Sequence, residues 1–272
     1  MGDPNVILLL IAALLLAGAG AGFAAGLFGI GGGFVVVPAL IILLPVLGVE
    51  QTIAAHVAVG TSLATIIFTS IRSTMSHAAR DAVDFSFLKS WAPFVVSGTI
   101  FGSLIAKFVS GSELALIFGI GVLIFAAHFL LPARTQQSAI TPLPAGVRRA
   151  SMAGSLGAIS ALLGIGGGTL TTLVMTTYGN PIHRAIGTAA GMGAIIAIPA
   201  TAGFILIGLF QPGLPFGSAG YVNVPAAIVI TLMSVLVAPL GAATAHILSP
   251  QVLRRVFGVY LAVVGVTMIA KY

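Results

Sequence analysis

A glycine-rich motif occurs twice in this sequence of 272 residues, and its residue types allow a definite chemistry. Gly-Ile-Gly-Gly-Gly occupies residues 29–33 and returns 135 residues later at residues 164–168. Consecutive glycines can adopt positive φ angles and point several backbone N–H groups into one concavity, an arrangement that binds anions. A helix that begins directly after the motif adds the positive end of its dipole. The sequence therefore predicts two anion-binding turns, whose backbone donors belong to Gly31, Gly32, Gly33, Gly166, Gly167 and Gly168.

Close packing of helices is the alternative interpretation of these glycines. It fits Gly18, Gly22 and Gly26, whose four-residue spacing lines one helix face with small residues. Packing does not require three consecutive glycines, each of which costs a helix about 1 kcal/mol relative to alanine. We therefore favour anion binding for the two triple-glycine motifs and keep packing as the alternative.

A second duplicated motif carries a histidine and a threonine. His56-x-Ala-Val-Gly-Thr61 recurs as His183-x-Ala-Ile-Gly-Thr188, at an offset of 127 residues. The hydroxyls of Thr61, Ser62 and Thr188 either coordinate an oxyanion or bond to a carbonyl of the preceding helical turn. His56 is the better candidate for a binding or proton-sensitive role, whereas His183 is expected near the membrane surface.

The composition indicates which solvent surrounds these motifs. Hydrophobic residues make up 58% of the chain, charged residues make up 6%, and the mean hydropathy is +1.18. A soluble domain of this size could not cover so much apolar surface, so the chain is expected in a lipid bilayer. The formal charge of +6 is spread over single and paired residues, without the basic stripe that nucleic acid requires. The absence of cysteine excludes disulfides and thiolate metal sites, and we expect no cofactor and no metal.

The acidic residues point away from enzymes and cation pathways. All five lie at the ends of apolar segments or between them: Asp3, Glu50, Asp81, Asp84 and Glu113. Cation carriers usually keep an acid inside the membrane. No phosphate-binding Walker sequence and no paired nucleophile and base stand out, so we expect no catalytic residue, and any active transport would be secondary.

Ten apolar segments define the expected architecture of the chain. They cover residues 5–28, 34–47, 52–71, 88–106, 113–131, 147–163, 169–178, 184–209, 222–246 and 251–270. A spanning helix needs about 20 residues, so the segments 34–47 and 169–178 are too short to cross. Each follows a glycine motif, and each is expected to be one arm of a re-entrant or broken helical hairpin.

The duplicated motifs divide the chain into two repeats. A third match, Ser110 with Leu114 to Gly119, recurs as Ser249 with Leu253 to Gly258. We predict an all-α integral membrane protein with repeats at 1–131 and 147–272, joined by a linker at 132–146. Each hairpin contributes two crossings or none, and the three further segments of each half cross once. The number of crossings per half is therefore odd, which predicts inverted repeats.

Basic residues predict the orientation in the membrane. The layout places nine of them on one side and only Lys107 and Lys271 on the other. Because positive residues favour the cytoplasmic side, both termini are expected outside and the linker inside, in a multi-pass inner-membrane protein. Trp91 is expected as an anchor at the membrane surface.

The motifs resemble those of the TauE/SafE family of anion permeases, over nearly the whole chain. The resemblance rests on residues 26–38, on Gly60-Thr-Ser62, on the second glycine motif and on residues 183–188. It implies transport of sulfite, sulfonates such as sulfoacetate, or related organosulfur compounds. The second half departs from the first at Leu173 and Ala189, where the first has Pro38 and Ser62. The two halves would then contribute unequally to a site.

We therefore expect a secondary transporter of a small sulfur-containing anion, working by alternating access. A passive anion channel is the alternative, and a membrane enzyme or scaffold is a more distant one. The sequence leaves open the coupling ion (proton or sodium), the direction of transport and the oligomeric state, a homodimer included.

Overall fold

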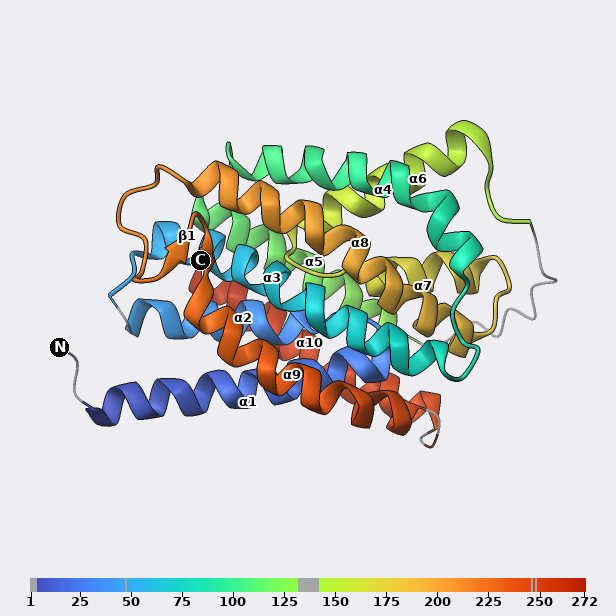
Figure 1. Cartoon of the computed structure of the whole chain (residues 1–272), viewed down its shortest axis with the longest axis horizontal. Coiled ribbons are helices and arrows are strands. Elements are labelled where there is room, and N and C mark those ends of the chain that lie inside the picture. Colours follow the sequence, from blue (N-terminus) through green and yellow to red (C-terminus); the bar gives the residue numbers. More distant parts are fainter. Residues whose placement is uncertain (1–3, 47, 132–141, 246, 248) are drawn as a thin grey trace.

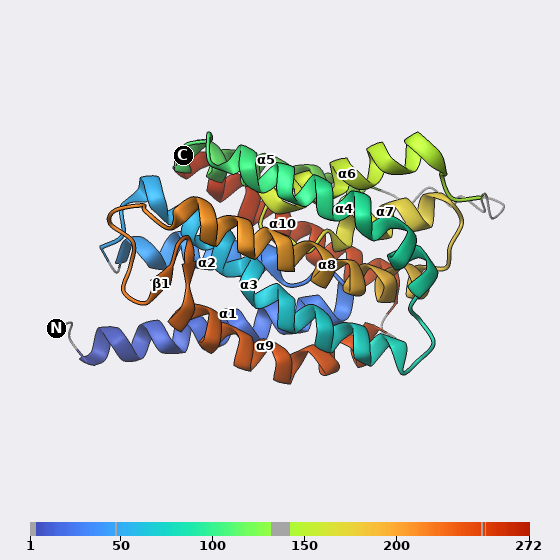
Figure 2. The same cartoon turned by 45° about the horizontal axis from the view of Figure 1, so that its top comes forward.

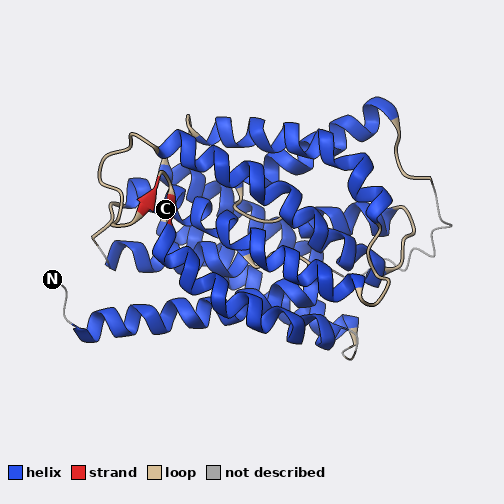
Figure 3. Cartoon of the chain, viewed as in Figure 1, coloured by secondary structure: helices blue, strands red, loops and turns tan. Residues whose placement is uncertain are grey.

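The computed structural model describes residues 4–46, 48–131, 142–245, 247 and 249–272, and these residues form a bundle of helices (Figures 1 and 3). One short antiparallel hairpin, β1 (Ser218–Ala219) and β2 (Val222–Asn223), precedes the ninth helix. The helices are α1 (Pro4–Phe28), α2 (Gly33–Val46), α3 (Gln51–Ala78), α4 (Phe85–Ala106), α5 (Gly111–Leu130), α6 (Gly146–Leu162), α7 (Gly168–Thr177), α8 (Ile182–Gly208), α9 (Val224–Ala245) and α10 (Pro250–Lys271).

These helices confirm the all-α membrane class. Each predicted apolar segment corresponds to one helix, and the short segments become α2, with 14 residues, and α7, with 10. Within the described ranges, six helices are long and apolar enough to cross a membrane: α1 from Leu8 onward, α3, α4, α5, α8 and α9. Most of the predicted linker, residues 132–141, lies outside the described residues.

Helix α3 extends to Ala78, seven residues beyond its apolar segment. Its polar end is stabilised by hydroxyl groups that bond to nearby carbonyls. Ser76 donates to the Arg72 carbonyl at 3.1 Å, and Ser73 donates across to the Ala25 carbonyl of α1 at 3.2 Å. Hydropathy alone therefore underestimates the length of this helix, because these polar side chains form hydrogen bonds within the protein.

Four close pairs of helices make up most of the packing. Helix α1 lies along α9, α4 along α6, α5 along α10, and α3 along α8 (Figures 1 and 2). Close packing was predicted for α1, and it is confirmed: a Cβ at Gly18 would lie 2.6 Å from the Ile230 carbonyl oxygen. In the most apolar stretch of α3, 78% of the residues are buried inside the protein. The corresponding share is 50% in α8 and 39% or less in the other candidate spans. Helix α3 is therefore the central element of the bundle.

The β-hairpin and the position of Trp91 differ from expectation. The segment 222–246 was predicted as one helix, but α9 begins at Val224, because Asn223 caps it by accepting the Ala226 N–H at 3.1 Å. Trp91 was expected at the membrane surface, but it is 1% exposed and stacks on Phe87 with ring centroids 4.6 Å apart. The core between α4, α6 and α8 takes up this large ring instead.

The two ends of the bundle carry different residues. Helix α1 begins and α10 ends at the same end, on the left of Figure 1, and α6 begins at the opposite end. The end at which α6 begins carries basic residues, which follow α3 or lie near the starts of α4, α6 and α8. They include Arg80, Lys89, Arg149 and Arg184.

Candidate substrate site

Both glycine motifs form turns with positive φ angles, as predicted, and anion binding by these turns stays a prediction. The first turn joins α1 to α2 and the second joins α6 to α7. Gly31 and Gly32 have φ angles of +76° and +80°, and Gly167, which precedes α7, has +64°. The Val36 N–H makes an early bond of α2, to the Gly32 carbonyl at 3.2 Å. The Val35 N–H just before it also bonds to the Gly32 carbonyl, at 2.9 Å. The helices begin one residue earlier than predicted, at Gly33 and Gly168.

The two turns pack directly against each other. A Cβ added to Gly33 would overlap the Gly164 carbonyl oxygen, and one added to Gly168 would overlap the Gly29 carbonyl oxygen. Residues 27–34 and 163–169 are all buried. The turns are therefore closed to solvent in this structure, and the packing interpretation also holds at Gly33 and Gly168.

One face of α3 lines the turns. Ser62, Ile66 and Ser70 are spaced four residues apart, so they share a helix face. The Ser62 Oγ donates to the Gly164 carbonyl at 2.9 Å. A Cβ at Gly31 would lie 2.9 Å from the Ile66 side chain and 3.4 Å from the Ser70 Oγ. Ser62 thus holds the second turn against α3, and its counterpart Ala189 has no hydroxyl to do the same.

Thr61 and Thr188 make equivalent contacts with the loops that lead into helices. The Thr61 Oγ1 accepts the Asn223 N–H at 2.9 Å, just before α9. The Thr188 Oγ1 accepts the Asp84 N–H at 2.8 Å, just before α4. The glycine before each threonine, Gly60 or Gly187, has no room for a Cβ beside the same loop. The duplicated Gly-Thr pair therefore fixes a loop in each half, and an anion-binding role for these threonines stays a prediction.

The two motif histidines lie in different surroundings. His56 is 5% exposed, its Nε2 lies 3.0 Å from the Ala106 carbonyl oxygen, and its ring stacks on Tyr221 with centroids 4.8 Å apart. These contacts place it between the end of α4 and the β-hairpin. His183 is exposed at the start of α8, as expected from the sequence. These contacts of His56 are not with the glycine turns, and substrate binding by His56 stays a prediction.

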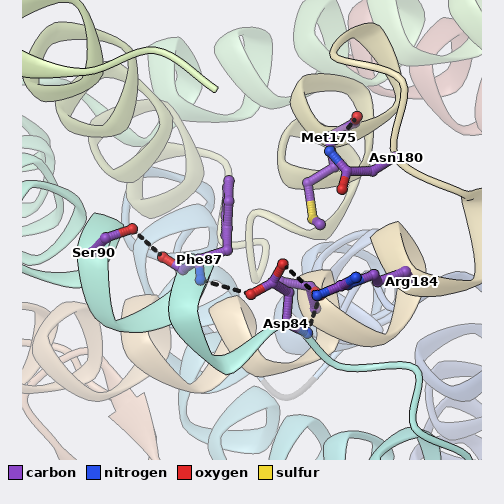
Figure 4. Close-up of polar contacts among 7 residues, drawn as sticks. Asp84, Phe87, Ser90, Met175, Asn180 and Arg184 are labelled. Atoms are coloured by element: carbon purple, nitrogen blue, oxygen red, sulfur yellow. Dashed lines mark hydrogen bonds and ion pairs between the residues drawn. The ribbon is translucent and has the colours of Figure 1, made fainter. Parts of the chain in front are cut away.

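An ion pair joins α4 to α8 at the basic end of the bundle (Figure 4). The Asp84 Oδ1 accepts the Phe87 N–H at 2.9 Å, and its Oδ2 lies 2.9 Å from the Arg184 Nη2. The Arg184 side chain is 51% exposed, so screening keeps this pair weak. Asn223 caps α9 in the corresponding position of the second half without a charge.

Two serines beside the turns were not predicted from the sequence. Ser70 is 1% exposed and Ser160 is 0% exposed, and neither Oγ has a hydrogen-bond partner. Neither belongs to a duplicated motif, because the equivalent positions hold Ala197 and Ala25. Only the contacts of the folded chain connect these serines to the glycine turns.

Comparison with known proteins agrees with this architecture. A curated protein of Haemophilus influenzae (strain ATCC 51907 / DSM 11121 / KW20 / Rd), described as a probable membrane transporter protein, is 34% identical over 94% of this chain and 97% of its own. A protein of Methanocaldococcus jannaschii with the same description is 27% identical over 96% of both chains. The protein YunE of Bacillus subtilis (strain 168), also a probable membrane transporter protein, is 31% identical over 60% of this chain and 66% of its own. No solved structure matches the chain significantly.

The apolar helices and these relatives define the class: a multi-pass integral membrane protein of a transporter family, whose members are named as transporters and not as enzymes. The family model described as sulfite exporter TauE/SafE matches residues 14–268. The chain therefore belongs to the TauE/SafE family.

Proposed function

We propose that this protein is a secondary transporter of small sulfur-containing anions, such as sulfite and sulfonates including sulfoacetate, which works by alternating access. The observation that carries this proposal is the pair of buried glycine turns at the starts of α2 and α7, with positive φ angles at Gly31, Gly32 and Gly167. Backbone N–H groups and helix N-termini suit an anion. Sulfite is proposed as a substrate because the matching family model is described as a sulfite exporter family.

Burial of the turns supports a carrier over an open channel. Residues 27–34 and 163–169 are shielded from solvent. The surface groove of about 400 Å³ between α4 and α6 lies elsewhere, lined by residues such as Phe94, Gly98 and Gly154. An anion can then reach the turns only when the helices around them rearrange, which is the requirement of alternating access.

Equivalent contacts support an inverted repeat with glycine-tipped hairpins. If α1 to α5 correspond to α6 to α10, the pair α1 with α9 corresponds to α6 with α4, and both pairs pack closely. The contact of Thr61 with Asn223 likewise corresponds to that of Thr188 with Asp84. The arms α2 and α7 reach only about 21 Å and 15 Å at 1.5 Å per residue, which favours hairpins that turn back within the bilayer.

Transport is tested in liposomes that contain the purified protein as the sole protein. We expect internal unlabelled sulfite to accelerate the uptake of labelled sulfite, because a carrier exchanges substrate across the membrane. Liposomes without protein are the control. Uptake that matches this control for sulfite, methanesulfonate and sulfoacetate would contradict the proposed function, and flux unaffected by internal substrate would indicate a channel.

We also propose that the protein lies in the inner membrane with both termini outside. The basic end of the bundle, which includes Arg80 and Arg184, would face the cytoplasm. In this chain without cysteine, Gln51→Cys at the start of α3 is expected to react with an impermeant thiol reagent in intact cells. Thr177→Cys, at the exposed end of α7, is expected to react only after permeabilisation. The reverse pattern, or reaction of both from one side, would contradict this orientation.

A further inference from the structure

Ser70 is an exception among the buried hydroxyls of α3. The Thr65 Oγ1 donates to the Ser62 carbonyl at 2.7 Å, the Thr69 Oγ1 to the Thr65 carbonyl at 2.9 Å, and Ser73 bonds to α1. The Ser70 Oγ, 1% exposed, has no partner. It lies against Gly31, and a Cβ at Gly193 of α8 would overlap it. A buried hydroxyl without a partner costs free energy, so this position indicates a bond that forms with a ligand.

Ser160 repeats this situation at the other turn. It is 0% exposed, its Oγ has no partner, and it would lie 2.9 Å from a Cβ at Gly167. Gly31 and Gly167 both have positive φ angles. Each glycine turn is therefore accompanied by a buried serine hydroxyl without a hydrogen-bond partner, and these two serines come from different halves of the chain.

The immediate surroundings of the turns carry no ionised side chain among the described contacts. The nearest neighbours of Gly31, Gly32, Gly166 and Gly167 are the side chains or backbone of Ala21, Ile66, Ser70, Leu156, Ser160, Gly193, Ile196 and Ile30. The positive charge at the site then comes from the N-termini of α2 and α7, about half a charge each. The C-terminal ends of α1 and α6 lie at the same turns. Because a helix C-terminus carries partial negative charge, these ends can only reduce the positive charge there. The two helix N-termini together therefore contribute about one positive charge at most.

We propose that Ser70 and Ser160 bind the substrate together with the glycine turns, and that this site selects singly charged sulfur oxyanions over doubly charged ones. This inference rests on the proposed function. Hydroxyls and N–H groups replace the water around one negative charge, but a second negative charge would remain without compensation in a buried site. Methanesulfonate and hydrogen sulfite belong to the favoured class. Sulfate and the sulfite dianion belong to the disfavoured one, and so does sulfoacetate, whose sulfonate and carboxylate groups carry two charges; it should therefore be the weakest of the substrates proposed above.

The role of the serines is tested with methanesulfonate, by calorimetry on purified full-length protein. Ser70→Ala and Ser160→Ala are expected to weaken binding by about tenfold or more, as for a bond to a charged group. Their thermal stability should not fall, because neither hydroxyl bonds within the protein. Ser73→Ala is the matched control: it is equally buried on the same helix but bonded to Ala25, so it should lose stability and keep its affinity. Wild-type affinity in folded Ser70→Ala and Ser160→Ala proteins would overturn the assignment of the serines.

Charge selection is tested on the wild-type protein, by competition against labelled sulfite in liposomes at mildly acidic pH, where most sulfite is the singly charged hydrogen sulfite. Methanesulfonate and sulfate both contain a sulfur bonded to three oxygens. The fourth group on the sulfur is a methyl group in methanesulfonate and a further oxygen in sulfate, which carries the second negative charge. We expect methanesulfonate to compete at least about tenfold more strongly. If sulfite is exchanged but methanesulfonate competes no more strongly than sulfate, the charge selection is overturned and the proposed function stands. Absence of exchange above protein-free liposomes for sulfite, methanesulfonate and sulfoacetate alike would overturn the proposed function and this inference with it.

Discussion

Gly33→Ala and Gly168→Ala are expected to lower the stability of the folded protein strongly. A Cβ at Gly33 would overlap the Gly164 carbonyl oxygen, and one at Gly168 would overlap the Gly29 carbonyl oxygen. Both contacts join backbone to backbone, so no side chain can rotate away to relieve them. Overpacking of this kind costs about 3 kcal/mol, a large part of a typical stability of about 5–15 kcal/mol. The measurement is the amount of monodisperse protein after extraction, followed by its melting temperature.

Gly154→Ala is the control for this prediction. Gly154 lies within α6, and the nearest atom to an added Cβ is the Phe94 carbonyl oxygen at 3.9 Å. Alanine is the better helix former by about 1 kcal/mol, so this variant should be at least as stable as the wild type. If Gly33→Ala and Gly168→Ala melt like Gly154→Ala, the close contact of the two turns is wrong.

The same geometry limits what alanine at the central glycines can show. From the sequence, Gly32→Ala and Gly167→Ala should weaken anion binding while the protein still folds. A Cβ added at Gly32 would lie 2.6 Å from the Ala21 carbonyl oxygen, and one added at Gly167 would overlap the Ile196 side chain. Both positions also have positive φ angles, so alanine there should reduce stability as well. The serine variants separate binding from stability better.

The glycine turns could be predicted from the sequence because their requirement is local. Three consecutive glycines favour positive φ and end a helix whatever surrounds them. The starts of α2 and α7 therefore fall within one residue of expectation. The helices could be predicted because a bilayer requires long apolar segments.

The partners of the polar side chains could not be predicted in this way. Thr61 bonds to Asn223, 162 positions away, and nothing in the sequence pairs them. Ser70 and Ser160 have no duplicated signal, since their equivalents are alanines. Duplication marks what both halves need for folding. It does not mark residues that only one half supplies.

Thr61→Val and Thr188→Val are the second pair of variants with a large expected effect. Valine has nearly the same shape as threonine but removes the oxygen that accepts the Asn223 or Asp84 N–H. An N–H group left without a partner in a buried place costs about 1–3 kcal/mol. Thr61 and Thr188 are both fully buried, so water cannot replace the lost acceptor at the threonine itself. Each variant should therefore lower the free energy of unfolding by this amount.

Serine substitutions distinguish the two roles that the sequence left open for these threonines. Thr61→Ser and Thr188→Ser keep the hydroxyl, so they should recover most of the stability lost with valine. If the threonines only hold their loops, valine variants that are still folded should bind methanesulfonate about as well as the wild type. Normal melting combined with an affinity loss of about tenfold, roughly 1.4 kcal/mol, would instead make the threonine hydroxyls substrate ligands. The loops before α4 and α9 would then depend on other contacts, such as the tight approach of Gly187 to Ala82 and of Gly60 to Tyr221.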